Sequence, residues 1–157
     1  MAKVSVLVAV YNASAYLPVC LDSLLNQTLK DIQVVCIDDC STDNSLAILD
    51  DYARKDNRID VVRLSKNGGQ AHARNEGLKV ASGDYVCMLD ADDWFSPDAL
   101  ESAVRAFSDA EVDCVLFDVM MTWQDKSHIY TMPSFEMLTG HEAFRLSLDW
   151  QIHGLYM

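Results

Sequence analysis

The chain has 157 residues, 50% of them hydrophobic, which is enough for one domain with a buried core. Acidic residues outnumber basic residues by 24 to 12, so the formal net charge is −12. This excess argues against nucleic acid as a partner, because duplex binding needs clustered Lys and Arg. It also means that an anionic ligand needs a local positive charge, and a metal ion is the most concentrated one available.

The cysteines and the N-terminus indicate the compartment. The cysteine count is odd, and most cysteines lie in apolar runs, as is typical of buried thiols in a reducing compartment: Cys20, Cys36, Cys40, Cys87 and Cys114. Cys36 and Cys40 have no second pair of ligands at zinc spacing, so no zinc site is expected. The first residues lead directly into an apolar strand, without a secretory signal or an apolar run of ~20 residues. We therefore expect a cytoplasmic protein, with peripheral association at the inner face of the membrane left open.

Predicted strands and helices alternate along most of the chain. Apolar, β-branched runs predict buried strands at 4–10, 32–37, 59–64 and 85–90. Apolar residues at helical spacing predict helices at 17–27, from 43 to about 52, at 70–81 and from 97 to about 107. Ser41 or Thr42 is expected to cap the second helix, and Ser96 with Pro97 is expected to begin the fourth.

The C-terminal part is less regular. A fifth strand is predicted at 112–121, and residues 123–133 show no clear period. The sequence Thr139-x-x-Glu142 predicts a capping box that opens a helix to about residue 148. The alternation through residue 121 predicts an α/β fold: a doubly wound, mostly parallel sheet with helices on both faces.

Three predicted strands end in polar residues. The first is followed by Tyr11-Asn12, the second by Asp38-Asp39, and the fourth by Asp90-Ala91-Asp92-Asp93. In a doubly wound sheet the carboxyl ends of the strands share one edge, where ligands bind. Carboxylates at this density repel one another unless a cation, a proton or water screens them. The pattern predicts a divalent-cation site, and the alternative is a solvated acidic turn that caps the next helix.

The residue types at these strand ends suit a nucleotide. Tyr11 offers a ring on which a base can stack, or it is an ordinary residue at the rim of the site. Asp39 can accept a hydrogen bond from a base N–H, or it caps the next helix. Gly68-Gly69 lets the backbone approach a ligand, and Arg74 and Lys66 can face a diphosphate. The spacing matches neither the dinucleotide-binding glycine loop nor the phosphate-binding P-loop.

Four segments in order and spacing match a known family. They are 6–12 (VLVAVYN), 37–43 (IDDCSTD), 67–77 (with NGG and ARNEG) and 82–93 (from SGDY to DADD). Over about residues 1–120 the chain resembles the nucleotide-binding half of an inverting family 2 glycosyltransferase of the GT-A fold. Ala9 and Cys40 stand where the family often has Pro and Gly.

The resemblance implies a role for each site residue. Val10 and Tyr11 would line the base pocket, Asp39 would bind N3 of uracil, and Asp38 would support that loop. Asp90 and Asp92 would form the D-x-D motif around Ala91, with Asp90 toward the ribose or sugar and Asp92 toward a Mn²⁺ or Mg²⁺ ion. Asp90 is a second candidate metal ligand, Asp93 would support the motif, and Arg74 would contact phosphate or sugar.

The resemblance also implies an activity. The enzyme would move a sugar from a nucleotide-sugar donor, expected to be a UDP-sugar, to an acceptor hydroxyl with inversion. The acceptor would be a glycan or a lipid-linked glycan of a cell-surface polysaccharide. The family carries its catalytic base well downstream of the D-x-D motif, and the later carboxylates match no motif: Asp125, Glu136, Glu142 and Asp149. We therefore expect the base to lie beyond Met157, and residues 1–157 to form a single, C-terminally truncated domain that binds donor but turns over slowly.

Two alternatives remain from the sequence. A nucleotidyltransferase on a similar sheet would also use carboxylates and a metal ion, but it would release pyrophosphate rather than a nucleoside diphosphate. A non-catalytic nucleotide-binding or receiver-like domain is the other. A receiver needs an acidic pair after its first strand, where this chain has Tyr11-Asn12. The sequence leaves the sugar, the acceptor and the oligomeric state open.

Overall fold

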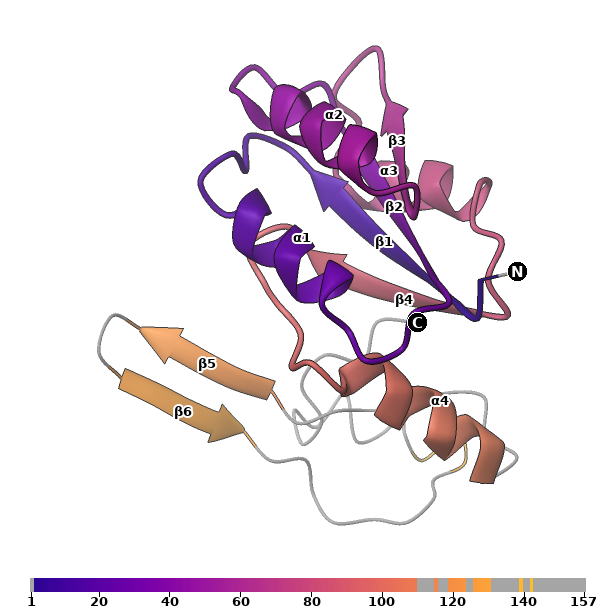
Figure 1. Ribbon diagram of the computed structural model, residues 1–157. Coiled ribbons are helices and arrows are strands. Elements are labelled where there is room, and N and C mark those ends of the chain that lie inside the picture. The colour runs from indigo at the N-terminus through magenta and orange to yellow at the C-terminus, as the bar shows by residue number, and fades with distance from the viewer. Residues whose placement is uncertain are drawn as a thin grey trace. The chain divides into compact units, whose positions relative to one another are not determined.

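The computed structural model describes residues 2–109, 115, 119–123, 126–130, 139 and 142. The chain divides into two compact units, residues 1–105 and residues 106–157. The first unit carries a parallel sheet between layers of helices, and the second carries a β-hairpin (Figure 1). The α/β fold expected from the sequence, a parallel sheet with helices on both faces, is confirmed for the first unit.

The parallel sheet has the strand order β3-β2-β1-β4. The central strand β1 (Val4–Val10) pairs with β2 (Ile32–Asp38) on one side and with β4 (Tyr85–Asp90) on the other. β3 (Ile59–Arg63) pairs with the outer side of β2. The chain therefore leaves β1 in one direction and returns on its other side, which creates a topological switch point between β1 and β4.

Helices cover both faces of this sheet (Figure 1). Alternate residues of β1, beginning with Val4 and Val6, join a core cluster with α1 (Leu17–Leu25) and α2 (Ser45–Lys55). Leu7 faces the other side and packs with Ala73 of α3 (Gln70–Leu78). None of the helices in the described part of the chain is long and apolar enough to cross a bilayer.

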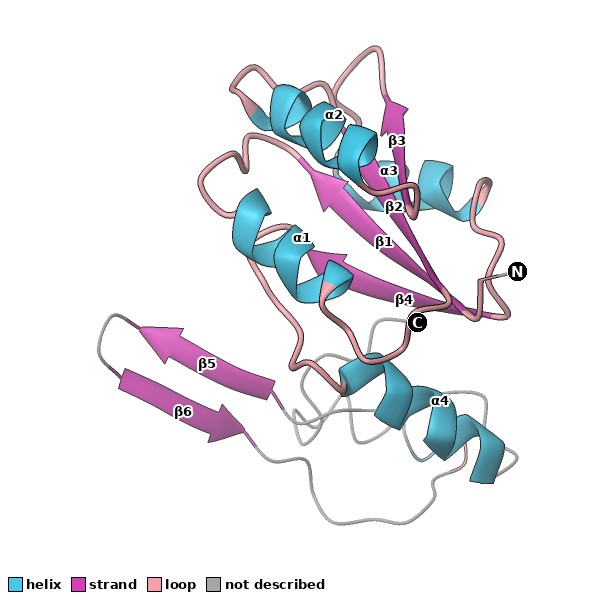
Figure 2. Ribbon diagram, in the orientation of Figure 1, coloured by secondary structure: helices cyan, strands magenta, loops and turns pink. Residues whose placement is uncertain are grey.

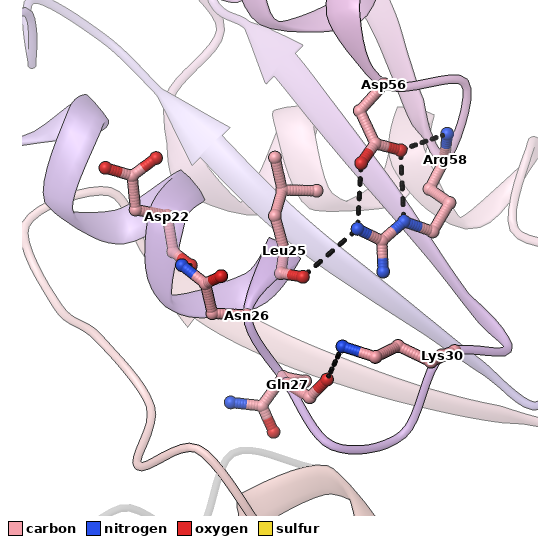
Figure 3. A network of polar contacts seen from close by, with 7 residues as sticks. All are labelled: Asp22, Leu25, Asn26, Gln27, Lys30, Asp56 and Arg58. Atoms are coloured by element: carbon pink, nitrogen blue, oxygen red, sulfur yellow. Dashed lines mark hydrogen bonds and ion pairs between the residues drawn. The ribbon is translucent and has the colours of Figure 1, made fainter.

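Cations satisfy the carbonyl groups at the C-terminal end of α1 (Figure 3). Arg58 donates from Nη2 to the main-chain oxygen of Leu25 at 3.1 Å, and Lys30 donates to that of Gln27 at 2.7 Å. Arg58 also holds Asp56 through two hydrogen bonds, of 3.0 Å from Nε and 2.8 Å from Nη2. This pair fixes the turn before β3 to the end of α1, where positive charge is favoured by the helix dipole.

Two non-glycine residues adopt left-handed backbone conformations in the loops after β1 and β2. They are Asn12, with φ 51°, and Cys40, with φ 62°. Asn tolerates this region, whereas for Cys the Cβ atom crowds the backbone. The Gly that the family often has at position 40 would adopt this conformation without strain.

Several helix ends differ from the sequence-based expectation. α1 ends at Leu25 rather than 27, and α4 (Ala99–Asp109) begins at residue 99 rather than 97. α2 begins at Ser45 and not at Asp43, because Asn12 Oδ1 accepts hydrogen bonds from the main-chain N–H groups of Thr42 and Asp43 and keeps them in the loop. The expected cap by Ser41 or Thr42 is therefore wrong. α3 ends at Leu78 rather than 81, and the next residues form turns. α4 follows β4 close to the predicted range.

The second unit contains an antiparallel hairpin of β5 (Val119–Trp123) and β6 (Lys126–Tyr130). Residues 123–133 were expected to be irregular, and this expectation is wrong for β6, which follows β5 after two residues, a common hairpin loop length. Most of the predicted strand 112–121 and the helix after residue 142 lie outside the described residues. The predicted capping box is confirmed, since Thr139 and Glu142 hydrogen-bond to each other.

We expect Arg58→Met to lower the free energy of unfolding by about 2 kcal/mol at pH 7, because it removes part-buried charged hydrogen bonds. Hydrogen bonding from Arg58 lowers the pKa of Asp56 below its usual value. The pair therefore stabilises the fold above about pH 4 and loses this contribution as pH falls through the folded-state pKa. Urea denaturation should show a difference from the unsubstituted protein that narrows between pH 5 and pH 2.

Arg54→Met is the matched control, since Arg54 pairs with Asp51 at the surface, with side chains 75% and 54% exposed. The side chains of Arg58 and Asp56 are only 22% and 23% exposed. The control should change stability by less than about 0.5 kcal/mol. Equal losses in the two variants would contradict the special role of Arg58.

Cys40→Gly should raise the free energy of unfolding by about 0.5–1 kcal/mol. The substitution relieves a left-handed strain of about 1–2 kcal/mol, partly offset by the greater backbone freedom of Gly in the unfolded chain. Cys40→Ala removes the thiol but keeps the Cβ atom, so it should not stabilise. The unfolding midpoint of the three proteins decides this, and a glycine variant no more stable than the alanine variant would count against strain at this position.

Candidate functional site

A cavity of about 600 Å³ lies at the carboxyl ends of β1, β2 and β4. The arrowheads of β1 and β4 point to this edge in Figure 2. Six of the seven residues expected from the sequence border the cavity: Val10, Tyr11, Asp39, Asp90, Ala91 and Asp92. The seventh, Arg74, is not part of its lining but binds one of the lining carboxylates, Asp90.

The loop after β1 presents Tyr11 to the cavity. Its side chain is 51% exposed, whereas Val10 is fully buried in the core and shapes the cavity without offering a polar side chain. Next to them, Asn12 donates its main-chain N–H to Ser41 Oγ at 3.1 Å and accepts from Thr42 N at 2.8 Å. Sequence reasoning did not single out Asn12 by itself, although it joins the loops after β1 and β2 and so supports the orientation of Tyr11.

Asp39 is almost fully buried and binds the loop before α3. Its Oδ1 and Oδ2 accept hydrogen bonds from the main-chain N–H groups of Gly68 and Gly69, each at 2.8 Å. The two glycines were expected to let the backbone approach a ligand; Gly69 borders the cavity, and both N–H groups bind this carboxylate. Each carboxylate oxygen has a second lone pair, so Asp39 can still accept a hydrogen bond from a ligand. Asp38 supports its own loop, as Oδ2 accepts from Ser41 N at 3.3 Å.

Asp90 is held by two side chains from α3. Its Oδ1 accepts from Arg74 Nη2 at 2.6 Å and from Gln70 Nε2 at 2.8 Å. Gln70, which also borders the cavity, was missed from the sequence. Its spacing from Arg74 was an available signal, because residues four apart lie on the same face of a helix. The ion pair compensates one negative charge of the acidic turn, and both hydrogen bonds reach the same oxygen of Asp90, Oδ1.

The acidic turn brings three carboxylates together. Ligand atoms of Asp90, Asp92 and Asp93 lie within 4.8 Å of one another, and the turn is closed by a 3.0 Å hydrogen bond from Asp93 N to Asp90 O. Burial raises the pKa of Asp93, and the charges of Asp92 and Asp90 raise it further. Oxygen donors in a strongly negative field suit a hard divalent cation such as Mg²⁺ or Mn²⁺. The residues present therefore fit the expected metal ion.

A thiol lies behind this turn and takes no part as a metal ligand. Cys20 of α1 donates from Sγ to the main-chain oxygen of Asp90 at 3.7 Å. Burial, with the nearby charges of Asp93, Asp92 and Asp90, raises the pKa of Cys20 to about 12, so the thiol keeps its proton at neutral pH. Within the described ranges, the acidic turn is the one cluster of three or more His, Cys, Asp or Glu side chains close enough to share an ion.

The chain is similar to known glycosyltransferases in sequence and to known structures in fold. The chain is 36% identical over 113 residues to glycosyltransferase GlyG of Streptococcus pneumoniae, covering 72% of this chain and 38% of that protein. A crystal structure of S. aureus TarS residues 1–349 in complex with UDP superposes with a TM-score of 0.64 at 35% identity, covering 68% of this chain and 32% of that one.

A third similar protein is the mannosyltransferase PcManGT from Pyrobaculum calidifontis in complex with GDP-Man and Mn²⁺. Its TM-score is 0.62 at 30% identity, covering 66% of this chain and 31% of that one. The chain thus aligns with about a third of the length of each of these proteins. The model of the family named Glycosyl transferase family 2 matches residues 5–156, so the chain belongs to this family of glycosyltransferases.

Proposed function

We propose that this chain binds a UDP-sugar together with a divalent cation and supplies the donor site of an inverting glycosyltransferase. The observation that carries the proposal is the single cavity at the edge of the sheet. It joins two groups suited to a base, Tyr11 and Asp39, with two carboxylates suited to a ribose and a cation, Asp90 and Asp92. The acceptor is proposed to be a hydroxyl of a glycan or a lipid-linked glycan, as in the synthesis of cell-surface polysaccharide.

The base end of the cavity suits uracil. The exposed ring of Tyr11 offers a face for stacking, and Val10 forms the apolar wall beside it. Asp39 is held in place by two main-chain donors, and its remaining lone pairs can accept a hydrogen bond from N3–H of uracil. The complex of the related TarS with UDP supports this choice of nucleotide.

The other end of the cavity suits a ribose and a diphosphate. Arg74 and Gln70 fix Asp90 through one oxygen, so the second can accept from a ribose or sugar hydroxyl. Asp92, with Asp90 as a second ligand, would hold Mn²⁺ or Mg²⁺, and the Mn²⁺ in the related mannosyltransferase supports this proposal. A bound cation would neutralise charge on the departing nucleoside diphosphate. Arg74 adds positive charge beside Asp90, and we propose that it contacts phosphate or sugar.

Inversion requires a base that takes the proton of the acceptor hydroxyl while the hydroxyl attacks the anomeric carbon from the opposite face. Among the described residues, the carboxylates that border the cavity are Asp39, Asp90 and Asp92, which already serve the nucleotide and the cation. We propose that the base is contributed from outside the described residues.

A cytoplasmic location suits the donor, and the described cysteines support it, because they are free: Cys20, Cys36, Cys40 and Cys87.

Asp92→Asn should weaken Mn²⁺-supported UDP binding by at least about tenfold, because it removes a charged ligand of the cation. Calorimetric titration of UDP, with Mn²⁺ and with chelator, measures the effect, and the variant should differ from the unsubstituted protein only when Mn²⁺ is present. Asp51→Asn makes the same charge change on the surface of α2, away from the cavity, and should bind as before. UDP binding that is independent of Mn²⁺ in the unsubstituted protein would contradict the cation part of the proposal.

N3-methyl-UDP tests the base contact without changing the fold. Methylation removes the N–H group from which Asp39 would accept a hydrogen bond. The unsubstituted protein should therefore bind this analogue at least about tenfold more weakly than UDP, a difference of ~1.4 kcal/mol in binding free energy. Asp39→Asn should bind both nucleotides weakly and with similar affinity. Equal binding of UDP and its methylated analogue by the unsubstituted protein would rule out Asp39 as the partner of N3.

A further inference from the structure

Polar groups along one side of α1 contact the segment that follows the acidic turn. Cys20, Ser23 and Gln27 recur at spacings of three and four residues, which places them on one helical face although Gln27 lies just past the end of α1. Each of the three has a main-chain partner within residues 90–100, the stretch that begins with the D-x-D motif. None of the three borders the cavity.

Gln27 makes the most contacts of this group. Its side chain is fully buried, and all of its polar atoms are used. Nε2 donates to the main-chain oxygens of Ser23 at 3.1 Å and Ser96 at 2.6 Å, while Oε1 accepts from Leu100 N at 3.0 Å. Figure 3 shows its side-chain amide directed away from Lys30, which binds the main-chain carbonyl of the same residue.

Further bonds from α1 hold both ends of the same segment. Ser23 Oγ accepts from Phe95 N at 3.2 Å, and Thr28 N donates to the main-chain oxygen of Pro97 at 2.8 Å. At the start of the segment the Cys20 thiol donates to the main-chain oxygen of Asp90. Between these anchors lie the exposed residues Asp92 and Asp93.

These contacts matter because the acidic turn crowds like charges together. Asp90, Asp92 and Asp93 repel one another, and a 3.0 Å hydrogen bond from Asp93 N to Asp90 O joins the two ends of the turn. Without fixed ends, the loop would relax and separate the carboxylates. A framework that holds the ends therefore preorganises the ligand atoms for a cation.

We propose that Gln27 is a positioning residue for the divalent cation, because it fixes the backbone of the loop that carries Asp92 and Asp93. The inference rests on the cation site proposed above. Groups that orient metal ligands without touching the metal typically change affinity by about 10–100-fold when they are removed. Gln27 should therefore control cation affinity while leaving the recognition of the base, on β1, β2 and α3, intact.

The test compares Gln27→Met with Gln33→Met. Gln33 is a similarly connected glutamine near the start of β2, at the other end of the sheet, where it accepts from Ser5 Oγ and Ser82 N and donates to the main-chain oxygen of Val80. Both variants should lower the unfolding temperature.

Electron paramagnetic resonance of free Mn²⁺, titrated in the presence of UDP, reports cation affinity, and calorimetry of UDP in chelator reports nucleotide binding without metal.

Gln27→Met should bind Mn²⁺ at least about tenfold more weakly, with Gln33→Met within about twofold of the unsubstituted protein. All three proteins should bind UDP alike in chelator. Ser23→Ala removes the acceptor of Phe95 N together with a 2.7 Å hydrogen bond within α1, from Ser23 Oγ to the main-chain oxygen of Cys20. It is a milder variant and should weaken Mn²⁺ binding by about threefold if Gln27→Met does not fold.

Unchanged Mn²⁺ affinity in Gln27→Met would overturn the inference, as would an equal loss of Mn²⁺ affinity in Gln33→Met. If Gln27→Met does not fold, unchanged Mn²⁺ affinity in Ser23→Ala would overturn it. Failure of the proposed function looks different, since the unsubstituted protein itself would then bind no Mn²⁺ with UDP present. That result would overturn the cation site and the role of Gln27 together.

Discussion

Parallel pairing on both sides of β1 is the constraint on which the site depends. In the registers of the sheet, Val10 lies beside Asp38 and Ala9 lies beside Asp90. The residues that follow these positions must therefore emerge at the same edge, whatever lies between them in the sequence. Because the chain turns to opposite sides of β1 for β2 and β4, the loops diverge there and leave a cavity rather than a packed surface.

Burying carboxylates at such an edge requires donors, and one short segment supplies most of them. The main-chain N–H groups of Gly68 and Gly69 bind Asp39, and the side chains of Gln70 and Arg74 bind Asp90. The start of α3 thus joins the carboxylate proposed for the base to the carboxylate proposed for the ribose. A change in this segment would alter both ends of the cavity, since buried charges without hydrogen bonds are strongly unfavourable.

The acidic turn is held from two sides. α3 binds the carboxylate of Asp90, whereas α1 and the residue Gln27 after it bind the backbone before and after the turn. The loop that carries Asp92 and Asp93 is therefore anchored at both ends, and burial together with the charges of Asp92 and Asp90 raises the pKa of Asp93. In a protein with a net charge of −12, the cation proposed for this site would screen the cluster, and the hydrogen bonds from α1 and α3 oppose its repulsion.

The sequence by itself determined the four strands of the parallel sheet and the strand-end residues of the site, whereas the strand order and the switch point came from the tertiary structure. Hydrophobic runs that stop at Tyr11, Asp39 and Asp90 are local signals, and parallel pairing converts them into one edge. Only the tertiary structure decided the partners of these residues. Gln70 and Gln27 stand in no motif, and the contacts of Gln27 reach across 69 and 73 residues. Amide side chains bind whatever backbone folding brings near, so their roles depend on packing between distant segments, which no periodicity along the chain encodes.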